Sequence, residues 1–160
     1  MGVYTPTMPR TQQTEREAAT RALTSCACFN LRKATRAVTQ LYDERLREAG
    51  LRTTQLSLLT VIQRHGKVTV SELAEAAVTD RTTLTRNLQL MSKRGWIRIQ
   101  PGRDRRVREV ELTPRGLAVM DRALPLWERA QAEVTGALGG KRFERLLSDL
   151  SATVAVAHPD

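Results

Sequence analysis

The sequence predicts a mostly α-helical protein with one small β-hairpin, and three observations support this fold class. Apolar residues recur at helical spacing through most of the chain. Residues from Trp96 to Leu112 instead alternate as two strands joined by a loop would. The composition, with 41% hydrophobic, 4% aromatic and 27% charged residues, is typical of a folded helical protein rather than a disordered one.

The N-terminal part is expected to contain a polar tail and then a long helix. Residues 1–22 are polar and predict a flexible tail that joins a helix near Glu15. Residues 23–50 predict the first long helix, with apolar positions such as Leu31 and Val38 and a stop at Gly50. The tail has no apolar section like that of a secretory signal, and no apolar run is long enough to span a bilayer, so we expect a cytoplasmic protein without a membrane partner.

The middle of the chain predicts a helix-turn-helix. A helix from Thr53 or Thr54 to Gly66 comes first. The run from Thr69 to Glu72 is a capping box that starts a short helix. Asp80 can cap the next helix, whose inward positions are Leu84, Leu88 and Met91.

After the hairpin, Thr113-Pro114 is a strong helix start, because threonine can cap and proline fits the first helical position. The helix behind it has a heptad rhythm from Leu117 to Leu138 in which Gln131 is the polar exception. Gly139-Gly140 then separates a last amphipathic helix. The terminal helices carry more apolar surface than a small domain can cover, which predicts a homodimer.

The positive charge is concentrated in one segment. Residues 78–108 carry nine basic and two acidic side chains, a net charge of +7 out of +9 for the whole chain. A localised basic surface is what binding to a phosphate backbone requires. We therefore expect double-stranded DNA as a partner.

The helix that starts at Arg81 is the candidate for reading bases, because the second helix of a helix-turn-helix lies in the major groove. Its face opposite Leu84 and Leu88 is polar; the alternative is a merely solvated face. The candidate DNA-contacting residues on the two helices are Ser71, Arg81, Thr82, Thr83, Thr85, Arg86, Gln89 and Lys93.

The hairpin loop adds a second candidate contact. It reads Arg103-Asp104-Arg105-Arg106. A carboxylate at Asp104 can hold one guanidinium in a fixed fork while its neighbour extends, and a narrow minor groove attracts such an arginine. The alternative is an ordinary charged turn.

Catalytic and metal sites are not expected. The chain has no glycine-rich nucleotide loop and no nucleophile next to a base, so it is predicted not to be an enzyme and to need no cofactor. Cys26 and Cys28 are spaced C-x-C rather than C-x-x-C, and on one helix they would point apart. His65 and His158 lie far from possible partner ligands, so no metal is predicted.

Four motifs together resemble the MarR family (multiple antibiotic resistance regulators) of bacterial repressors: Thr69 to Ala74, Asp80 to Arg86, Asp104-Arg105-Arg106, and Leu112 to Gly116. The resemblance implies a winged helix-turn-helix over residues 51–113, with residues 23–50 and 114–158 forming interlocking dimerisation helices. It also implies a homodimeric regulator that reads a palindromic operator. Val78 stands where the family commonly has glycine.

The resemblance also implies a signal that releases DNA, either a small aromatic acid or an oxidant such as a peroxide. Cys28 with Tyr42 resembles the hydroperoxide-sensing branch of the family, although Arg32 and Thr53 stand where that branch has further tyrosines. A thiol near a helix N-terminus can be reactive. The alternative is that Cys26 and Cys28 only pack as small apolar residues.

One other class of function stays open at this point. A winged helix can serve as a dimerisation or protein-docking module without DNA specificity. The concentration of charge between residues 78 and 108 argues against that interpretation.

Overall fold

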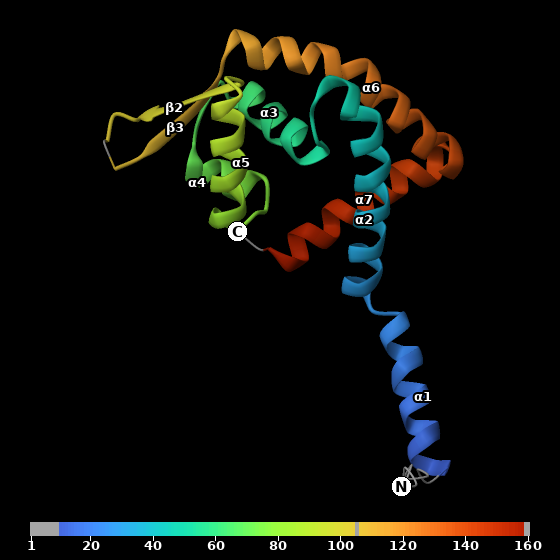
Figure 1. The fold of residues 1–160 in the computed structure, drawn as a ribbon. Coiled ribbons are helices and arrows are strands. Elements are labelled where there is room, and N and C mark those ends of the chain that lie inside the picture. The colour runs from blue at the N-terminus through green and yellow to red at the C-terminus, as the bar shows by residue number, and fades with distance from the viewer. Residues whose placement is uncertain (1–9, 105, 159–160) are drawn as a thin grey trace, which may run out of the picture. The chain divides into compact units, whose positions relative to one another are not determined.

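The computed structural model describes residues 10–104 and 106–158. These described residues divide into two compact units, with the boundary between residues 40 and 41. Figure 1 shows the order of the elements along the chain. The first unit contains α1 (Arg10–Thr24) and most of α2 (Ala27–Leu46). The amide of Asn30 donates to the carbonyls of Thr24 (2.8 Å) and Cys26 (2.9 Å), so one side chain links the end of α1 to the start of α2.

The helix α1 differs from the flexible tail that the sequence indicates up to residue 22. Residues 10–24 are rich in Ala, Arg, Glu and Gln, which all favour a helix even where no apolar core supports it. The polarity of the segment predicted its exposure, and the helix that was expected near Glu15 begins earlier, at Arg10. Residues 1–9 of the expected tail lie outside the described residues.

The second unit begins with the end of α2 and the short 3₁₀ helix η1 (Arg47–Ala49), followed by α3 (Thr53–His65), β1 (Lys67–Thr69), α4 (Val70–Ala76) and α5 (Arg81–Lys93). The hairpin strands are β2 (Ile97–Pro101) and β3 (Arg108–Leu112), and α6 (Pro114–Leu138) and α7 (Gly140–Ala157) complete it. The mostly helical fold with a small β-hairpin is thereby confirmed.

The strands form an antiparallel sheet in the order β1-β3-β2. Val110 of β3 pairs with Val68 on one side and with Ile99 on the other. The three-residue strand β1 was not predicted, because it is too short to show an alternating pattern and depends on pairing with a distant strand.

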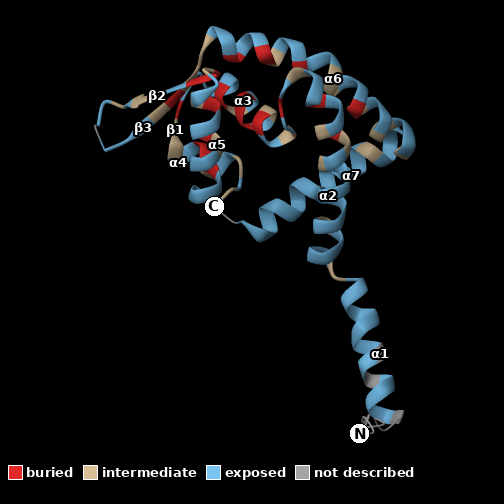
Figure 2. Cartoon of the chain, in the orientation of Figure 1, coloured by how far each residue is buried: buried red, intermediate tan, exposed pale blue. Residues whose placement is uncertain are grey.

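The core of the second unit lies between the sheet, α3, α4, α5 and the first half of α6 (Figure 2). Its largest fully buried side chains are Leu46, Leu59, Ile62, Leu73, Leu84, Met91, Val110 and Val119. The predicted inward positions of α5 are therefore confirmed. They fix which side of α5 remains exposed.

The join between the hairpin and α6 is tightly packed. Thr113 caps α6, since its Oγ1 accepts a hydrogen bond from the Gly116 amide (3.1 Å). A Cβ atom at Gly116 would lie 2.1 Å from the carbonyl oxygen of Trp96. Glycine at this position allows α6 to begin directly against the backbone of Trp96, the residue before β2.

The turn between α4 and α5 is built on Val78, which has φ 45°. A β-branched residue rarely adopts this left-handed conformation, which glycine adopts freely. The carbonyl of Glu75 accepts from the Val78 amide (2.9 Å) and that of Ala74 from the Thr79 amide (3.0 Å). The turn therefore keeps a left-handed geometry and its hydrogen bonds although the residue is valine.

Candidate nucleic-acid interface

The first helix of the helix-turn-helix begins with the predicted capping box. Thr69 Oγ1 accepts from the Glu72 amide (3.1 Å), and Glu72 Oε2 accepts from the Thr69 amide (2.8 Å). The backbone hydrogen bond from Thr69 is the main reason that the pKa of Glu72 is lowered. This reciprocal cap fixes the start of α4 and thereby the position of Ser71 in its first turn.

The second helix begins with the predicted cap at Asp80. Its Oδ1 accepts from the Thr83 amide (2.9 Å), and this backbone hydrogen bond lowers the pKa of Asp80. The cap fixes where α5 starts, and so decides which residues occupy its first turn.

The face of α5 that points away from the core is polar and accessible. Leu84, Leu88 and Met91 are buried on the inner side. The sequence-predicted contact residues of this helix are all exposed: Arg81, Thr82, Thr83, Thr85, Arg86, Gln89 and Lys93. Arg86, Gln89 and Lys93 extend a stripe at helical spacing from the N-terminal turns toward the end of α5.

Two of the predicted residues bind each other. Arg81 Nη2 donates to Ser71 Oγ (3.0 Å), which links the first turns of α4 and α5. Thr85 Oγ1 donates to the carbonyl of Arg81 (2.7 Å), so its hydroxyl hydrogen is used within the helix and its methyl group remains for apolar contact.

In the hairpin turn Asp104 has a role in the backbone that the sequence did not indicate. Its Oδ1 accepts from the backbone amide of Arg106 (2.9 Å), and its carbonyl accepts from the Val107 amide (2.9 Å). Neither Arg103 nor Arg106 makes an ion pair with this carboxylate among the described residues, and Arg105 lies outside them. The carboxylate therefore shapes the backbone of the turn, and it pairs with neither of the two described guanidinium groups beside it.

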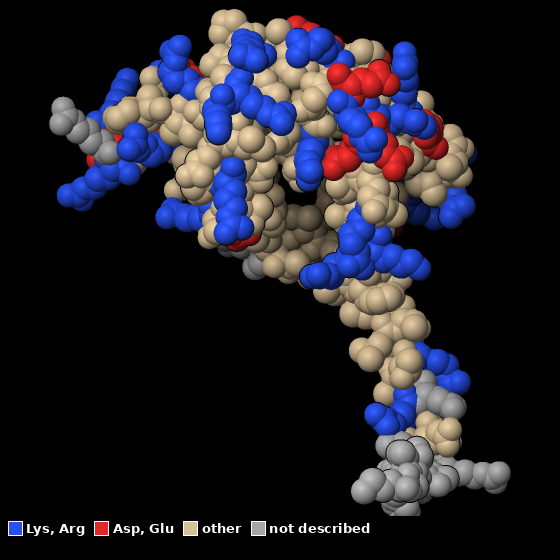
Figure 3. All heavy atoms as spheres, viewed as in Figure 1, with Lys and Arg blue, Asp and Glu red and all other residues tan. Residues whose placement is uncertain are grey.

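The helix-turn-helix and the hairpin meet at a groove of about 440 Å³. Its lining includes the predicted residues Ser71, Arg81, Thr85, Gln89 and Arg106. Arg103 and Asp104 are exposed at the turn beyond it. Figure 3 shows Lys and Arg side chains gathered over the hairpin and along α5, whereas much of the acidic surface in this view lies elsewhere.

Arg108 also lines this groove and was not among the predicted contact residues. The sequence contains a signal that would have found it. The signal is the alternation of the return strand, which places Arg108 on the same face as Val110, two residues away. Val110 is fully buried, so that this face is the one turned toward the core.

Two other basic residues of the segment are engaged elsewhere. Arg94 Nη1 donates to the carbonyl of Gly50 (2.7 Å), and its guanidinium lies 4.9 Å from the centre of the Trp96 ring. Arg98 pairs with Glu111 (3.2 Å) on the sheet. Both arginines belong to the basic segment, but their guanidinium groups bind other parts of the protein.

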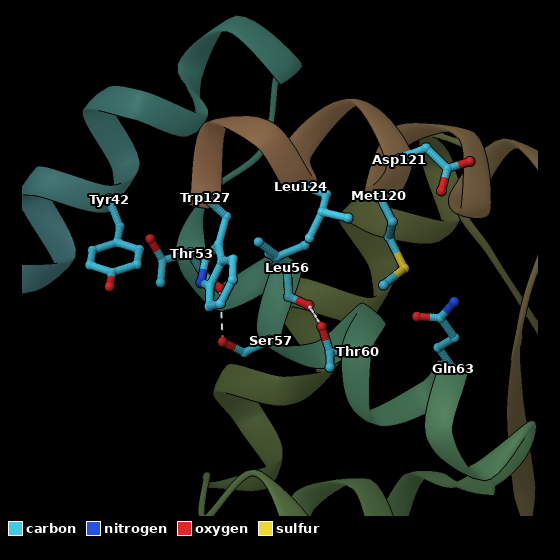
Figure 4. A pocket seen from close by; sticks show the side chains of 10 residues that line it. All are labelled: Tyr42, Thr53, Leu56, Ser57, Thr60, Gln63, Met120, Asp121, Leu124 and Trp127. Carbon is cyan, nitrogen blue, oxygen red and sulfur yellow. Dashed lines mark hydrogen bonds between the residues drawn. The ribbon is translucent and has the colours of Figure 1, made fainter. Parts of the chain in front are cut away.

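A separate cavity of about 550 Å³ lies between α3 and α6, near the end of α2 (Figure 4). Leu56, Met120, Leu124 and Trp127 give it apolar walls, and Asp121 is the charged residue of the lining. Thr53 Oγ1 is buried at this cavity without a hydrogen-bond partner.

Tyr42 lines the same cavity, and its hydroxyl donates to Gln131 Oε1 (2.5 Å). This bond explains the polar exception in the heptad pattern of α6. Burial raises the pKa of Tyr42.

The two residues of the predicted redox pair, Cys28 and Tyr42, both lie on α2. Cys28 is exposed in the first turn of α2 in the first unit, whereas Tyr42 belongs to the second unit. Cys26 precedes α2 instead of lying on it, so the expectation that both cysteines share one helix and diverge is not met.

The described residues contain no group of three or more His, Cys, Asp or Glu side chains that could hold a metal ion. Within the same residues, no helix is both long enough and apolar enough to cross a bilayer.

Comparison with known proteins gives consistent matches. A sequence model described as MarR family matches residues 49–107. The transcriptional regulator MosR of M. tuberculosis, crystallised in complex with DNA, is 42% identical with a TM-score of 0.73, over 83% of this chain and 98% of that one. A search of the curated proteins gave no match.

Two more distant structures share the fold. A mutant of MarR from E. coli complexed with operator DNA is 24% identical with a TM-score of 0.72, over 78% of this chain and 90% of that one. A probable transcriptional regulator from Pseudomonas aeruginosa is 23% identical with a TM-score of 0.74, over 82% of this chain and 98% of that one.

Proposed function

Because this chain belongs to the MarR family of DNA-binding transcriptional regulators, a non-enzymatic family, we propose that it is a homodimeric repressor that reads a palindromic operator. The observation that carries this proposal is the convergence of α4, α5 and the hairpin on one groove edged by Arg81, Arg106 and Arg108. Three guanidinium groups beside a polar helix face suit a phosphate backbone next to base edges.

The proposed readout divides between the helix and the hairpin. In the major groove Arg86 would pair with guanine and Gln89 with adenine, while the methyl groups of Thr82 and Thr85 contact thymine. Ser71, Thr83 and Lys93 would bind the backbone nearby. The arginines at the hairpin turn, Arg103 to Arg106, would enter the minor groove.

The dimer is supported by apolar side chains that the single chain leaves exposed. The exposed apolar residues of α6 and α7 are Leu117, Leu124, Leu146, Leu147, Leu150, Val154 and Val156. We assign dimerisation to residues 23–50 and 114–158 and DNA binding to residues 51–113. A two-fold dimer of this kind would read half-sites about one helical turn apart.

The regulatory signal is proposed to be a small aromatic molecule in the cavity between α3 and α6. Its apolar walls suit an aromatic ring, and the free Thr53 Oγ1 can bind a ligand hydroxyl. Asp121 would repel a carboxylate, so a neutral phenol fits this cavity better than a phenolic acid. A ligand bound in this cavity would contact both α3 and α6.

Oxidation of Cys28 is the second proposed signal. The proposal is supported by the exposure of the Cys28 thiol, which a peroxide can reach from solvent. Gel-shift assays of wild type and Cys28→Ser after peroxide treatment distinguish a cysteine that senses the oxidant from one that only packs. If both proteins keep their DNA equally, oxidant sensing at Cys28 is excluded.

The proposed readout is tested by binding to duplexes from the DNA flanking the protein's own gene. Arg86→Ala should abolish the preference for one duplex over others. Arg106→Ala should weaken binding to every duplex and reduce the salt slope by about one unit, because one phosphate is no longer neutralised. Arg122→Ala, at an exposed position of α6 away from the groove, is the matched control.

Two results would contradict the proposal. A salt slope unchanged in Arg106→Ala would remove the hairpin from the interface. Wild-type protein that binds all duplexes equally, or none, would favour a dimerisation or docking module without DNA specificity.

A further inference from the structure

A second cavity, of about 710 Å³, lies on the other side of the α2–α3 junction. It is lined by η1, the loop that follows it, the first turn of α3, and the C-terminal half of α5. The charged groups in its lining are Arg47, Arg52, Arg94 and Asp43. Three guanidinium groups and one carboxylate leave this cavity positively charged.

The carboxylate is already engaged. Asp43 Oδ1 accepts from the Thr53 amide (2.7 Å), which satisfies a free donor at the start of α3. The ion pairs among the described residues do not include Arg47, Arg52 or Arg94. The positive charge of the cavity is thus not neutralised by a neighbouring carboxylate at ion-pair distance.

Two groups in the cavity are held in place with hydrogen-bond donors to spare. Arg94 is fixed by the carbonyl of Gly50 and by the Trp96 ring, and a guanidinium has five N–H donors. Gln55 is only 3% exposed, and its Oε1 accepts from the Arg52 amide (3.0 Å). No hydrogen bond from Gln55 Nε2 occurs among the described residues, so a nearly buried amide donor lines the cavity unused.

From these observations we propose that the cavity lined by Arg47, Arg52, Gln55 and Arg94 binds an oxyanion of the phosphate type. Planar guanidinium groups bind such oxygens in a bidentate manner, and the Gln55 amide adds a neutral donor. The anion is either free phosphate or a phosphodiester of bound DNA. Only the second source rests on the proposed function.

The site would influence DNA binding because α5 forms one of its walls. Asn87 and Leu90 of α5 and its C-terminal cap residue Arg94 line the cavity, and the same helix carries Arg86 and Gln89. An anion here would bridge α5 and the α2–α3 junction, at a place separate from the apolar cavity proposed for an aromatic signal.

The test uses the full-length protein and inorganic phosphate at constant ionic strength. Calorimetric titration of the wild type should saturate, and Arg47→Gln/Arg52→Gln should bind phosphate at least ten-fold more weakly. Both arginines are exposed, so their replacement should leave the fold intact. Arg122→Gln, outside the cavity, should bind phosphate like the wild type. Arg47→Lys/Arg52→Lys keeps the charge without the planar fork, and should bind with intermediate affinity.

A second arm distinguishes the source of the anion. DNA binding is measured against salt in phosphate-free buffer, where each phosphodiester that is no longer bound reduces the slope by about 0.9. Saturable phosphate binding that the double Gln variant loses identifies free phosphate, and a reduced slope without phosphate binding identifies DNA. If the double variant matches the wild type in both measurements, the proposed site is refuted. Failure of wild type to bind DNA would instead contradict only the proposed function.

Discussion

The left-handed valine at the turn of the helix-turn-helix predicts that Val78→Gly stabilises the protein. Val78 has φ 45°, and its side chain is 54% exposed, so its removal sacrifices little packing. A left-handed residue with a Cβ costs roughly 1–2 kcal/mol, whereas glycine costs roughly 0.5–1 kcal/mol through the entropy of the unfolded chain. The free energy of unfolding should therefore rise by about 0.5–1 kcal/mol in the variant.

The assay is equilibrium unfolding in urea at one fixed protein concentration, since dimerisation makes stability concentration-dependent. Val107→Gly is the matched control: Val107 is 36% exposed in the hairpin turn and is not among the described residues with positive φ. It should lose about 0.5–1 kcal/mol. If Val78→Gly loses as much as Val107→Gly, the turn holds no strain for glycine to relieve.

Three further predictions concern other parts of the second unit. Gly116→Ala places a Cβ 2.1 Å from the Trp96 carbonyl oxygen and should lower the free energy of unfolding by about 2 kcal/mol or more. Gly136→Ala in the same helix should instead raise it, because a Cβ there meets no heavy atom within 4 Å apart from its chain neighbours and its own helix backbone. Equal urea midpoints for the two variants would refute this prediction. The lowered pKa of Asp80 implies stabilisation that is present above its ordinary pKa near 3.8 and is lost as the pH falls through the lower folded value. Asp80→Asn should flatten this acid dependence of stability, and an unchanged profile would contradict it. Tyr42→Phe removes the donor to Gln131 and should cost about 1 kcal/mol, which the double variant Tyr42→Phe/Gln131→Leu should partly recover; strict additivity would argue against the bond.

The features that the sequence predicted well are local. The caps at Thr69, Asp80 and Thr113 depend on donors and acceptors within three residues of each other, and all three form. The inward face of α5 follows from helical spacing alone. The exposed polar face of α5, which we propose reads bases, was predictable for the same reason, because burial of Leu84 and Leu88 leaves that side of the helix exposed.

The features that the sequence did not reveal depend on distant parts of the chain. The strand β1 exists because it pairs with β3, and Gln131 has a partner because α6 brings it to Tyr42. Asp104 was expected to bind a guanidinium, but a backbone amide in the tight turn lies within its reach. The cavities of about 550 Å³ and 710 Å³ could not be recognised from a continuous sequence motif, because each is lined by several segments of the chain.

The basic segment illustrates why a net charge counted from the sequence overstates the number of phosphate contacts at an interface. Residues 78–108 carry a net charge of +7, yet Arg98 is paired with Glu111 on the sheet. Counterion release depends on the number of phosphates contacted and not on the net charge of a segment. The salt dependence of DNA binding should thus reflect fewer contacts per protomer than the sequence suggests. The basic side chains therefore have different roles. Those on the exposed side of α5 and on the hairpin point into solvent, where DNA would bind. Arg94 instead links the C-terminal end of α5 to Gly50 at the α2–α3 junction.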